Sequence, residues 1–84
     1  MAYFARLDPT YMVTEVVAVN NSDIDYLPFP DSEPVGIAFL QTIFGLDTVW
    51  KQTSYNASFR KIYAGIGSYY NSELDIFQSK PPSP

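Results

Sequence analysis

The chain begins with a pattern typical of an antiparallel hairpin. Residues Ala2–Leu7 alternate weakly between apolar and polar positions, which predicts a strand. Asp8-Pro9-Thr10-Tyr11 follows, with Asp and Pro in the first two positions of a type I turn. Residues 12–19 are rich in β-branched side chains and apolar on both faces. We expect a second strand here, paired with the first and central in its sheet because both faces favour burial.

A loop and a helix are predicted next. Residues 20–30 begin with the turn-forming Asn20-Asn21-Ser22 and contain two prolines, so they predict a loop. Asp31-Ser32-Glu33-Pro34 offers capping side chains and a proline in the first turn, and Gly45 predicts a left-handed end. The helix should run for about three turns and lie across the sheet. Its apolar stripe consists of Val35, Ile37, Phe39, Leu40, Ile43 and Phe44.

The second half of the chain predicts three more strands, joined by a polar loop around Tyr55-Asn56 and a turn at Asn71-Ser72-Glu73. Gly65 and Gly67 interrupt the middle one. The sequence therefore predicts an α+β fold: a mainly antiparallel sheet of about five short strands with one helix packed on one face. Residues 1–79 should form a single domain, and residues 80–84 a proline-rich C-terminal strap. The three strands are Thr48–Thr53, Ile62–Tyr70 and Leu74–Gln78.

The aromatic content is high for a chain of 84 residues, with six Phe, seven Tyr and one Trp. Rings of this size bury roughly 150–250 Å² each, so one small core cannot hold them all and some should lie at an interface. We place Trp50 in the main core, together with Phe39, Ile43 and Ile66. Cys and His are both absent, which excludes a disulfide and argues against a zinc site.

Charge is distributed unevenly along the chain. Residues 1–50 carry seven acids and one base, a net −6, whereas residues 51–84 carry four bases and two acids, a net +2. An acidic protein is a poor candidate for nonspecific nucleic-acid binding. The asymmetry either favours head-to-tail packing of copies or arose by chance. No apolar run approaches the roughly 20 residues of a membrane span, and we expect no signal peptide and no membrane partner.

Candidate chemistry is sparse. Gly65-Ile66-Gly67 lacks the third glycine of a dinucleotide fingerprint, since Tyr70 stands in its place. Asp23, Asp25 and Asp31 share a loop, but the glycine and terminal Glu of a calcium loop are missing. No nucleophile stands beside a base in any recognisable motif. We therefore expect no catalytic, cofactor-binding or metal-binding residues, and no enzymatic activity.

Arg60-Lys61 lies among aromatic residues, namely Tyr55, Phe59 and Tyr63. Three interpretations remain open for this basic and aromatic cluster. Arg60 could pair with an acid and stack on a ring inside the protein. The cluster could instead form a protein interface, or stack bases and bind phosphates. Adjacent basic residues on opposite sides of a strand do not make a nucleic-acid groove, so the third interpretation is the weakest.

The stretch from Trp50 to Gly67 also carries a resemblance. Its parts are Trp-Lys-Gln-Thr-Ser-Tyr-Asn at 50–56, Phe-Arg-Lys at 59–61 and Tyr-Ala-Gly-Ile-Gly at 63–67. This signature resembles a family of small uncharacterised or structural proteins of tailed phages of marine bacteria and cyanobacteria. Residues 1–8 resemble the start of that family and residues 73–82 its end, whereas the middle is less similar.

The resemblance implies a non-enzymatic virion structural protein. We expect a small capsid decoration or cement protein, located in the virion, that packs in many copies against the major capsid protein and against itself. The alternatives are a tail, neck or fibre-associated component of the particle, or a small intracellular regulator that binds a host enzyme.

Ten residues are predicted to form the interface. They come from the basic and aromatic cluster, from the following tyrosines and from the strap. Because three of the five strap residues are proline, the strap should run extended and serve assembly more than folding. The ten are Tyr55, Phe59, Arg60, Lys61, Tyr69, Tyr70, Lys80, Pro81, Pro82 and Pro84.

Overall fold

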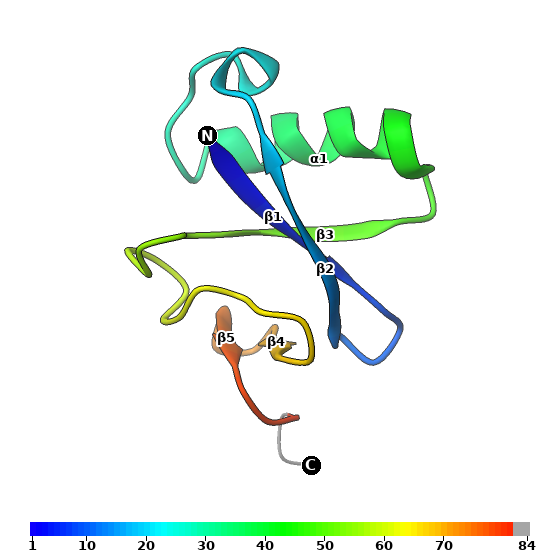
Figure 1. Cartoon of the computed structure of the whole chain (residues 1–84), viewed down its shortest axis with the longest axis vertical. Coiled ribbons are helices and arrows are strands. Elements are labelled where there is room, and N and C mark those ends of the chain that lie inside the picture. The colour runs from blue at the N-terminus through cyan, green and yellow to red at the C-terminus, as the bar shows by residue number, and fades with distance from the viewer. Residues whose placement is uncertain (82–84) are drawn as a thin grey trace.

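A computed structural model describes residues 1–81 of the chain (Figure 1). The predicted contacts of Pro82 and Pro84 therefore lie outside the described residues. The fold is α+β with one helix and five antiparallel strands, which confirms the predicted class. The strands form two sheets, ordered β2-β1-β3 and β4-β5. The elements are β1 (Ala2–Leu7), β2 (Val13–Val19), the 3-10 helix η1 (Asn21–Ile24), α1 (Ser32–Phe44), β3 (Val49–Thr53), β4 (Tyr69–Asn71) and β5 (Ile76–Gln78).

The first strand, β1, is the centre of the larger sheet. It pairs with β2 on one side and with β3 on the other, both antiparallel. The prediction that the second strand is central was therefore wrong. Residues of β2 are apolar on both faces because both faces of the sheet are covered, by α1 on one side and by the C-terminal segments on the other. Periodicity reports which faces are buried but not which edges are paired.

Two hydrophobic cores lie on the two faces of this sheet, and β1 contributes alternate side chains to both. Phe4 points toward the helix and Ala5 toward the C-terminal hairpin, and both are fully buried. The helix-side core comprises Ala2, Phe4, Val19, Ile24, Leu40 and Trp50. The second core comprises Ala5, Leu7, Val13, Ala64, Tyr70 and Phe77.

The helix positions buried against the sheet include two small residues. Ser32, Gly36 and Leu40 recur every four residues and are the buried positions of the helix. Phe4 lies directly against Gly36, where a side chain would collide with its ring. This close approach rotates the predicted stripe, and Ile43 is 59% exposed. Trp50 is buried with Phe39 packed nearby, as expected, but the predicted roles of Ile43 and of Ile66, which is 78% exposed, were wrong.

The helix ends differ in detail from those predicted. Asp31 occupies the N-cap position, but its side chain makes no capping hydrogen bond, and the Ser32 hydroxyl is directed instead to Gln52. Gly45 ends the helix, with φ 119° and ψ 149°. This extended conformation at positive φ is open to glycine but is not the left-handed helical cap expected.

The segment before β4 was predicted as a long strand and is largely irregular. Of the predicted strand Ile62–Tyr70, only the last two residues belong to β4. Two backbone hydrogen bonds still tie this segment to the start of β2, from Gly67 to the Val13 carbonyl and from Val13 to the Ser68 carbonyl. Upstream, Arg60 and Lys61 adopt positive φ angles of 55° and 72°, which break any strand.

We predict that Gly36→Ala destabilises the protein by about 1–3 kcal/mol, because a core that is already filled resists added volume. A Cβ atom at Gly36 would lie 2.7 Å from Cε1 and 2.9 Å from Cε2 of Phe4. Phe4 is fully buried, so its ring cannot move aside without disturbing its neighbours in the core. Urea unfolding followed by Trp50 fluorescence measures the effect. Gly65→Ala is the matched control, since a Cβ there meets nothing within 4 Å. Equal midpoints for the two variants would refute this account of the helix contact.

Candidate functional site

Arg60, the centre of the predicted basic and aromatic cluster, is a structural residue. Its side chain is 7% exposed and forms ion pairs with Glu33 and Asp75. Both terminal nitrogens of the guanidinium bond the Glu33 carboxylate, and Nε lies 2.8 Å from Oδ1 of Asp75. This bidentate geometry suits the planar guanidinium. Among the three interpretations, pairing of Arg60 with acids inside the protein is the one confirmed.

The same ion pair closes the outer edge of β3. The Gln52 backbone N–H donates to Oε2 of Glu33 at 2.7 Å, and Nη1 of Arg60 donates to the Gln52 carbonyl at 2.9 Å. A carboxylate and a guanidinium thus take the positions that a fourth strand would occupy. Exposed strand edges invite pairing with other chains, so this arrangement blocks β3 near its C-terminal end.

Two aromatic rings contact the guanidinium. Its central carbon lies 5.1 Å from the Phe29 ring centre and 5.6 Å from that of Tyr70. Tyr70 is buried, and its hydroxyl donates to Asp75 at 2.5 Å. Arg60 and Tyr70 were predicted as interface residues, but their side chains are used inside the fold and are not offered to a partner.

Burial and hydrogen bonding shift the protonation of this group of side chains. Burial raises the pKa of Tyr70 to about 12, and its hydrogen bond to Asp75 acts in the same direction. For Asp75, burial favours the neutral form, but hydrogen bonds from Tyr70 and Arg60 outweigh it and hold the pKa below the usual value. For Arg60, burial favours the neutral form, yet Glu33 and Asp75 raise the pKa. Around neutral pH, Arg60 and Asp75 therefore stay charged and Tyr70 stays neutral.

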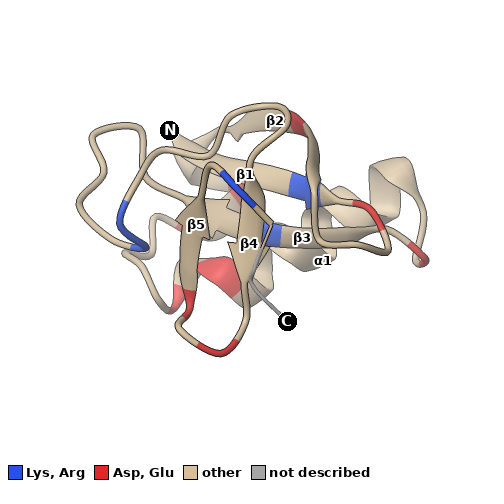
Figure 2. Ribbon diagram, turned by 90° about the horizontal axis from the view of Figure 1, so that it is seen from below, with Lys and Arg blue, Asp and Glu red and all other residues tan. Residues whose placement is uncertain are grey.

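The other predicted interface residues are more accessible. Tyr55 is 69% exposed. Lys61, Lys80 and Pro81 are exposed as well, whereas Phe59 and Tyr69 are half-buried. Figure 2 shows the Lys and Arg positions scattered along the described chain rather than gathered on one face.

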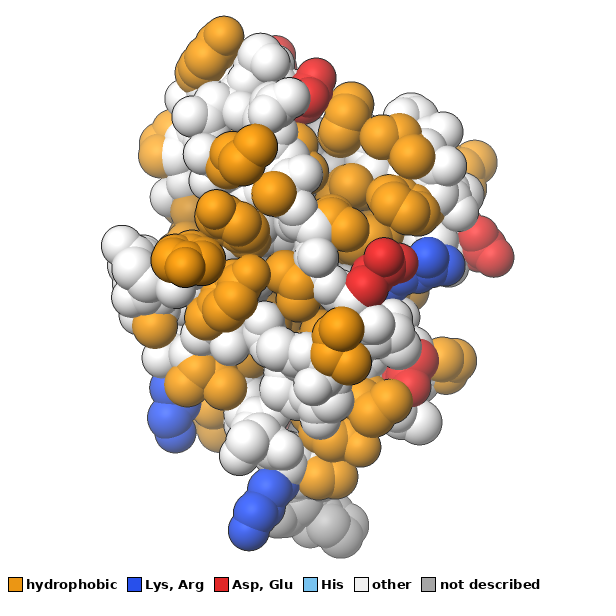
Figure 3. Space-filling model, in the orientation of Figure 1, with side chains coloured by type: hydrophobic (Ala, Val, Ile, Leu, Met, Phe, Trp, Pro, Cys, Tyr) orange, Lys and Arg blue, Asp and Glu red, His pale blue; other side chains and the backbone are white. Residues whose placement is uncertain are grey.

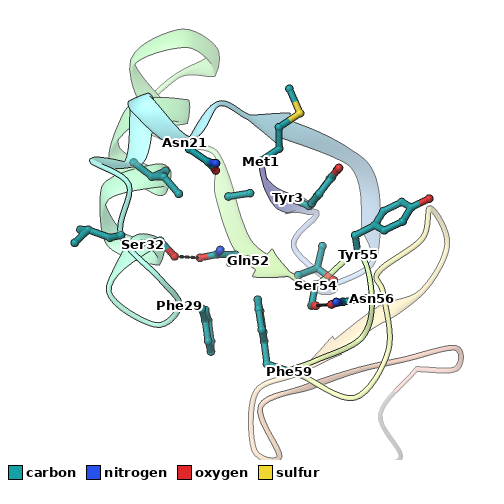
Figure 4. Close-up of a pocket in the computed structure, with 14 residues that line it drawn as sticks. Met1, Tyr3, Asn21, Phe29, Ser32, Gln52, Ser54, Tyr55, Asn56 and Phe59 are labelled. Atoms are coloured by element: carbon teal, nitrogen blue, oxygen red, sulfur yellow. Dashed lines mark hydrogen bonds between the residues drawn. The ribbon is translucent and has the colours of Figure 1, made fainter.

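A groove of about 390 Å³ opens beside Tyr55, at the N-terminal end of β1 (Figure 4). Tyr3 and Tyr55 line one side, and Phe29 and Phe59 the other. The two Phe rings stack on each other, with centres 3.8 Å apart and planes within 3°. Neither acidic nor basic side chains occur among the residues that line the groove. The groove is thus a mixed surface of four aromatic rings and several uncharged polar side chains, of a size typical of ligand sites.

Gln52 places an unused hydrogen-bond donor in this groove. The residue is 5% exposed, and its Oε1 accepts a hydrogen bond from the Ser32 hydroxyl at 2.8 Å. Its Nε2 has no hydrogen-bond partner within residues 1–81 but is not sealed off from solvent. Nε2 therefore reaches open space, and Gln52 lines the groove. Because Nε2 is open to solvent, water can satisfy it, and it is equally available to donate to a bound partner.

The rim of the groove extends into a cluster of three tyrosines. The ring centres of Tyr3 and Tyr55 lie 5.5 Å apart, and those of Tyr55 and Tyr63 lie 5.3 Å apart. Burial, and then the neighbouring phenols of Tyr3 and Tyr55, raise the pKa of Tyr63. With its pKa raised, Tyr63 stays neutral at physiological pH, and the three side chains present aromatic edges and hydroxyls. Figure 3 shows apolar side chains gathered over much of the face seen in Figure 1.

Sequence reasoning found part of this groove and missed the rest. Tyr55 and Phe59 were among the predicted interface residues, whereas Tyr3, Phe29 and Gln52 were not. One signal was present: Gln52 shares a strand face with Trp50, and a polar side chain on a core face often has a specific task. Nothing in the sequence indicated that Phe29 and Phe59 stack.

Comparisons with known proteins found no relative of this chain. No family model matches the chain, and searches of curated proteins and of solved structures found no significant match. Within residues 1–81, no helix has the length and apolar character to cross a membrane. In the same part of the chain, no three Asp or Glu side chains gather to hold a metal ion.

We predict that Arg60→Met destabilises the protein by about 3–5 kcal/mol, because Glu33 and the β3 edge lose their buried partner. Lys61→Met is the matched control: its side chain is exposed, so the change should stay within about 0.5 kcal/mol. Chemical denaturation of both variants measures the difference. If Arg60→Met were as stable as the control, the guanidinium would not hold the fold together.

A second prediction concerns acid stability. Because the folded pKa of Asp75 is lowered, its contribution to stability is present above the unfolded value near 4 and is lost as pH falls through the folded value. Tyr70→Phe removes one hydrogen bond and should move the Asp75 pKa upward. NMR titration of the carboxyl groups measures this shift. Asp8, whose pKa is lowered mainly by the Thr10 hydroxyl, is the internal control and should not move.

Proposed function

We propose that this chain is a non-enzymatic structural protein of a tailed-phage particle, and specifically a small capsid decoration protein. In this proposal it binds neighbouring subunits, the major capsid protein and copies of itself, through the aromatic groove. The observation that carries the proposal is the groove between Tyr55 and Phe59, which has no Asp, Glu, Lys or Arg in its lining and has Nε2 of Gln52 available as a donor. The phage context comes from the resemblance of the 50–67 signature.

The chemistry of the groove favours binding over catalysis. Its lining includes no Asp, Glu, Lys or Arg side chain, groups that commonly move a proton or stabilise an anion. It offers ring faces, phenol hydroxyls and amides instead. Buried cores of protein interfaces have this composition, enriched in aromatic side chains and depleted of charge.

Support beneath the groove is rigid. Phe29 and Phe59 stack on each other, and Phe29 also lies against the guanidinium of Arg60. A surface held in its binding conformation loses little entropy when a partner docks. In a shell of many copies, weak contacts made this way sum to a stable attachment. The proposed decoration role requires only this sum of weak contacts and no catalytic turnover.

Mass spectrometry of purified virions tests the proposal. We expect hundreds of copies per particle. A dozen or fewer would replace decoration with a tail or neck position, and absence of the chain would overturn the virion role in favour of an intracellular regulator.

Binding through the groove has its own test. Tyr55→Ala should lower occupancy of the particle several-fold without changing the thermal midpoint of the isolated protein, since Tyr55 is largely exposed. Leu46→Ala is the matched control, because Leu46 is 85% exposed and follows the other end of α1. Equal loss in both variants would show that the groove is not the binding surface.

A further inference from the structure

We propose that two copies of this chain pair through the open edges of their β2 strands, antiparallel and across a two-fold axis. The pairing joins the two three-stranded sheets into one continuous sheet. None of residues 13–19 lines the aromatic groove, so this surface is separate from the proposed binding groove. The inference goes beyond the proposed function and does not depend on it.

The two edges of the three-stranded sheet differ. On β3, Glu33 and Arg60 bond the backbone N–H and carbonyl of Gln52. On β2, the segment 67–68 bonds only the first residue, Val13. Within residues 1–81, the backbone of residues 14–19 has no hydrogen bonds other than those of its pairing with β1. A strand paired on one side leaves a row of N–H and C=O groups unpaired on the other, and on β2 this row is open.

The C-terminal hairpin offers no comparable edge. Its strands, β4 and β5, have three residues each, and both outer sides are bonded. The Tyr70 N–H donates to the Tyr11 carbonyl at 2.9 Å, and the Phe77 N–H donates to the Arg60 carbonyl at 3.1 Å. Among residues 1–81, β2 is therefore the longest open edge.

The side chains of β2 do not protect this edge. Natural edge strands often carry Lys or Pro, and residues 13–19 contain neither. The one charged side chain, Glu15, is already bonded to Arg6 at 3.1 Å. A register shift, which also protects edges, lies between Arg6 and Leu7, and the pairing of residues 15–19 with β1 beyond it is regular.

Both hydrophobic cores reach this edge. Val17 packs against the helix-side core and Val16 against the second core, and each is only half-buried. In Figure 1, β2 crosses in front of β1 and β3, and Figure 3 shows apolar side chains gathered on that same face. A strand added beside β2 covers both valines and extends both cores, so it must be apolar on its two faces. β2 itself has this pattern, because Ala18 shares a face with Val16 and Val19 shares one with Val17.

An antiparallel pairing of β2 with its own copy also avoids charge repulsion. When the two-fold axis passes through Val16, through Val17 or between them, Glu15 lies opposite an uncharged residue of the second copy. Like charges placed directly opposite each other would destabilise the pairing. Because the other edge of the sheet is blocked at Gln52, each copy has one edge to offer, and the closed two-fold assembly stops at two copies.

Sedimentation of the full-length protein, with two matched variants, tests the inference. The mass should rise with concentration from one chain to two and no further. Ala18 is exposed, and Ala18→Asp should weaken the dimer at least about tenfold, because a carboxylate between paired strands loses water and gains no partner. Leu46→Asp adds the same charge at a position that is 85% exposed and outside β2, and should leave the dimer unchanged. Thermal midpoints of the two variants show that both remain folded.

NMR of the unsubstituted protein provides a measurement that needs no variant. In a mixture of differently labelled chains, NOEs between copies should connect backbone protons of residues 14–19. Backbone amides in this range that exchange quickly with solvent in dilute protein should exchange more slowly in the dimer. A chain that stays monomeric at NMR concentrations, contacts between copies outside β2, or open-ended assembly would each overturn the inference. Equal weakening by the two Asp variants would do the same.

A groove variant separates this inference from the proposed function. Tyr55→Ala should leave the dimer unchanged, since Tyr55 lies in the groove and outside β2. Loss of the dimer in this variant would place self-association in the groove and overturn the inference. If β2 does not pair while Tyr55→Ala still lowers virion occupancy, the inference is wrong and the proposed function stands. A β2-paired dimer of a chain absent from virions would show the reverse.

Discussion

The buried guanidinium of Arg60 is the interaction on which the rest of the structure depends. It joins segments that are distant in sequence: the start of α1 through Glu33, the edge of β3 through Gln52, and the C-terminal hairpin through Asp75. A charge removed from water must be fully paired, so none of these segments can shift without leaving an unsatisfied group. The stacked rings of the groove rest against this pairing. The fold and the candidate site are therefore stabilised together.

Local pattern was enough to predict the N-terminal hairpin, the helix and the third strand, because each is encoded by its own spacing of apolar residues. It failed where distant contacts decide the outcome. The left-handed conformations of Arg60 and Lys61 arise in a segment whose guanidinium is fixed by residues far away in sequence. The rotation of α1 follows from the space that Gly36 leaves for Phe4, and neither residue alone indicates this rotation in the sequence.

The candidate site was less predictable than the fold. Tyr55 and Phe59 could be selected because an excess of aromatic residues must leave some at the surface. The same reasoning wrongly selected Arg60 and Tyr70, since sequence does not show whether a cation near aromatic rings faces inward or outward. The groove itself is made by residues from the N-terminus, from 21–32 and from 52–59, at the end of β3 and in the loop after it. Only the folded chain brings these three together.

The central position of β1 affects how the protein is made. β1 precedes both of its partners in the chain, and β2 can pair with one of its sides almost at once. Its other side stays unpaired until Val49–Thr53 has been made. This second pairing closes a long loop, which slows folding. During that interval the nascent chain carries an open strand prone to pairing with other molecules. Chain termini usually tolerate trimming and added tags. Here, by contrast, removing the first few residues takes out the middle of the sheet.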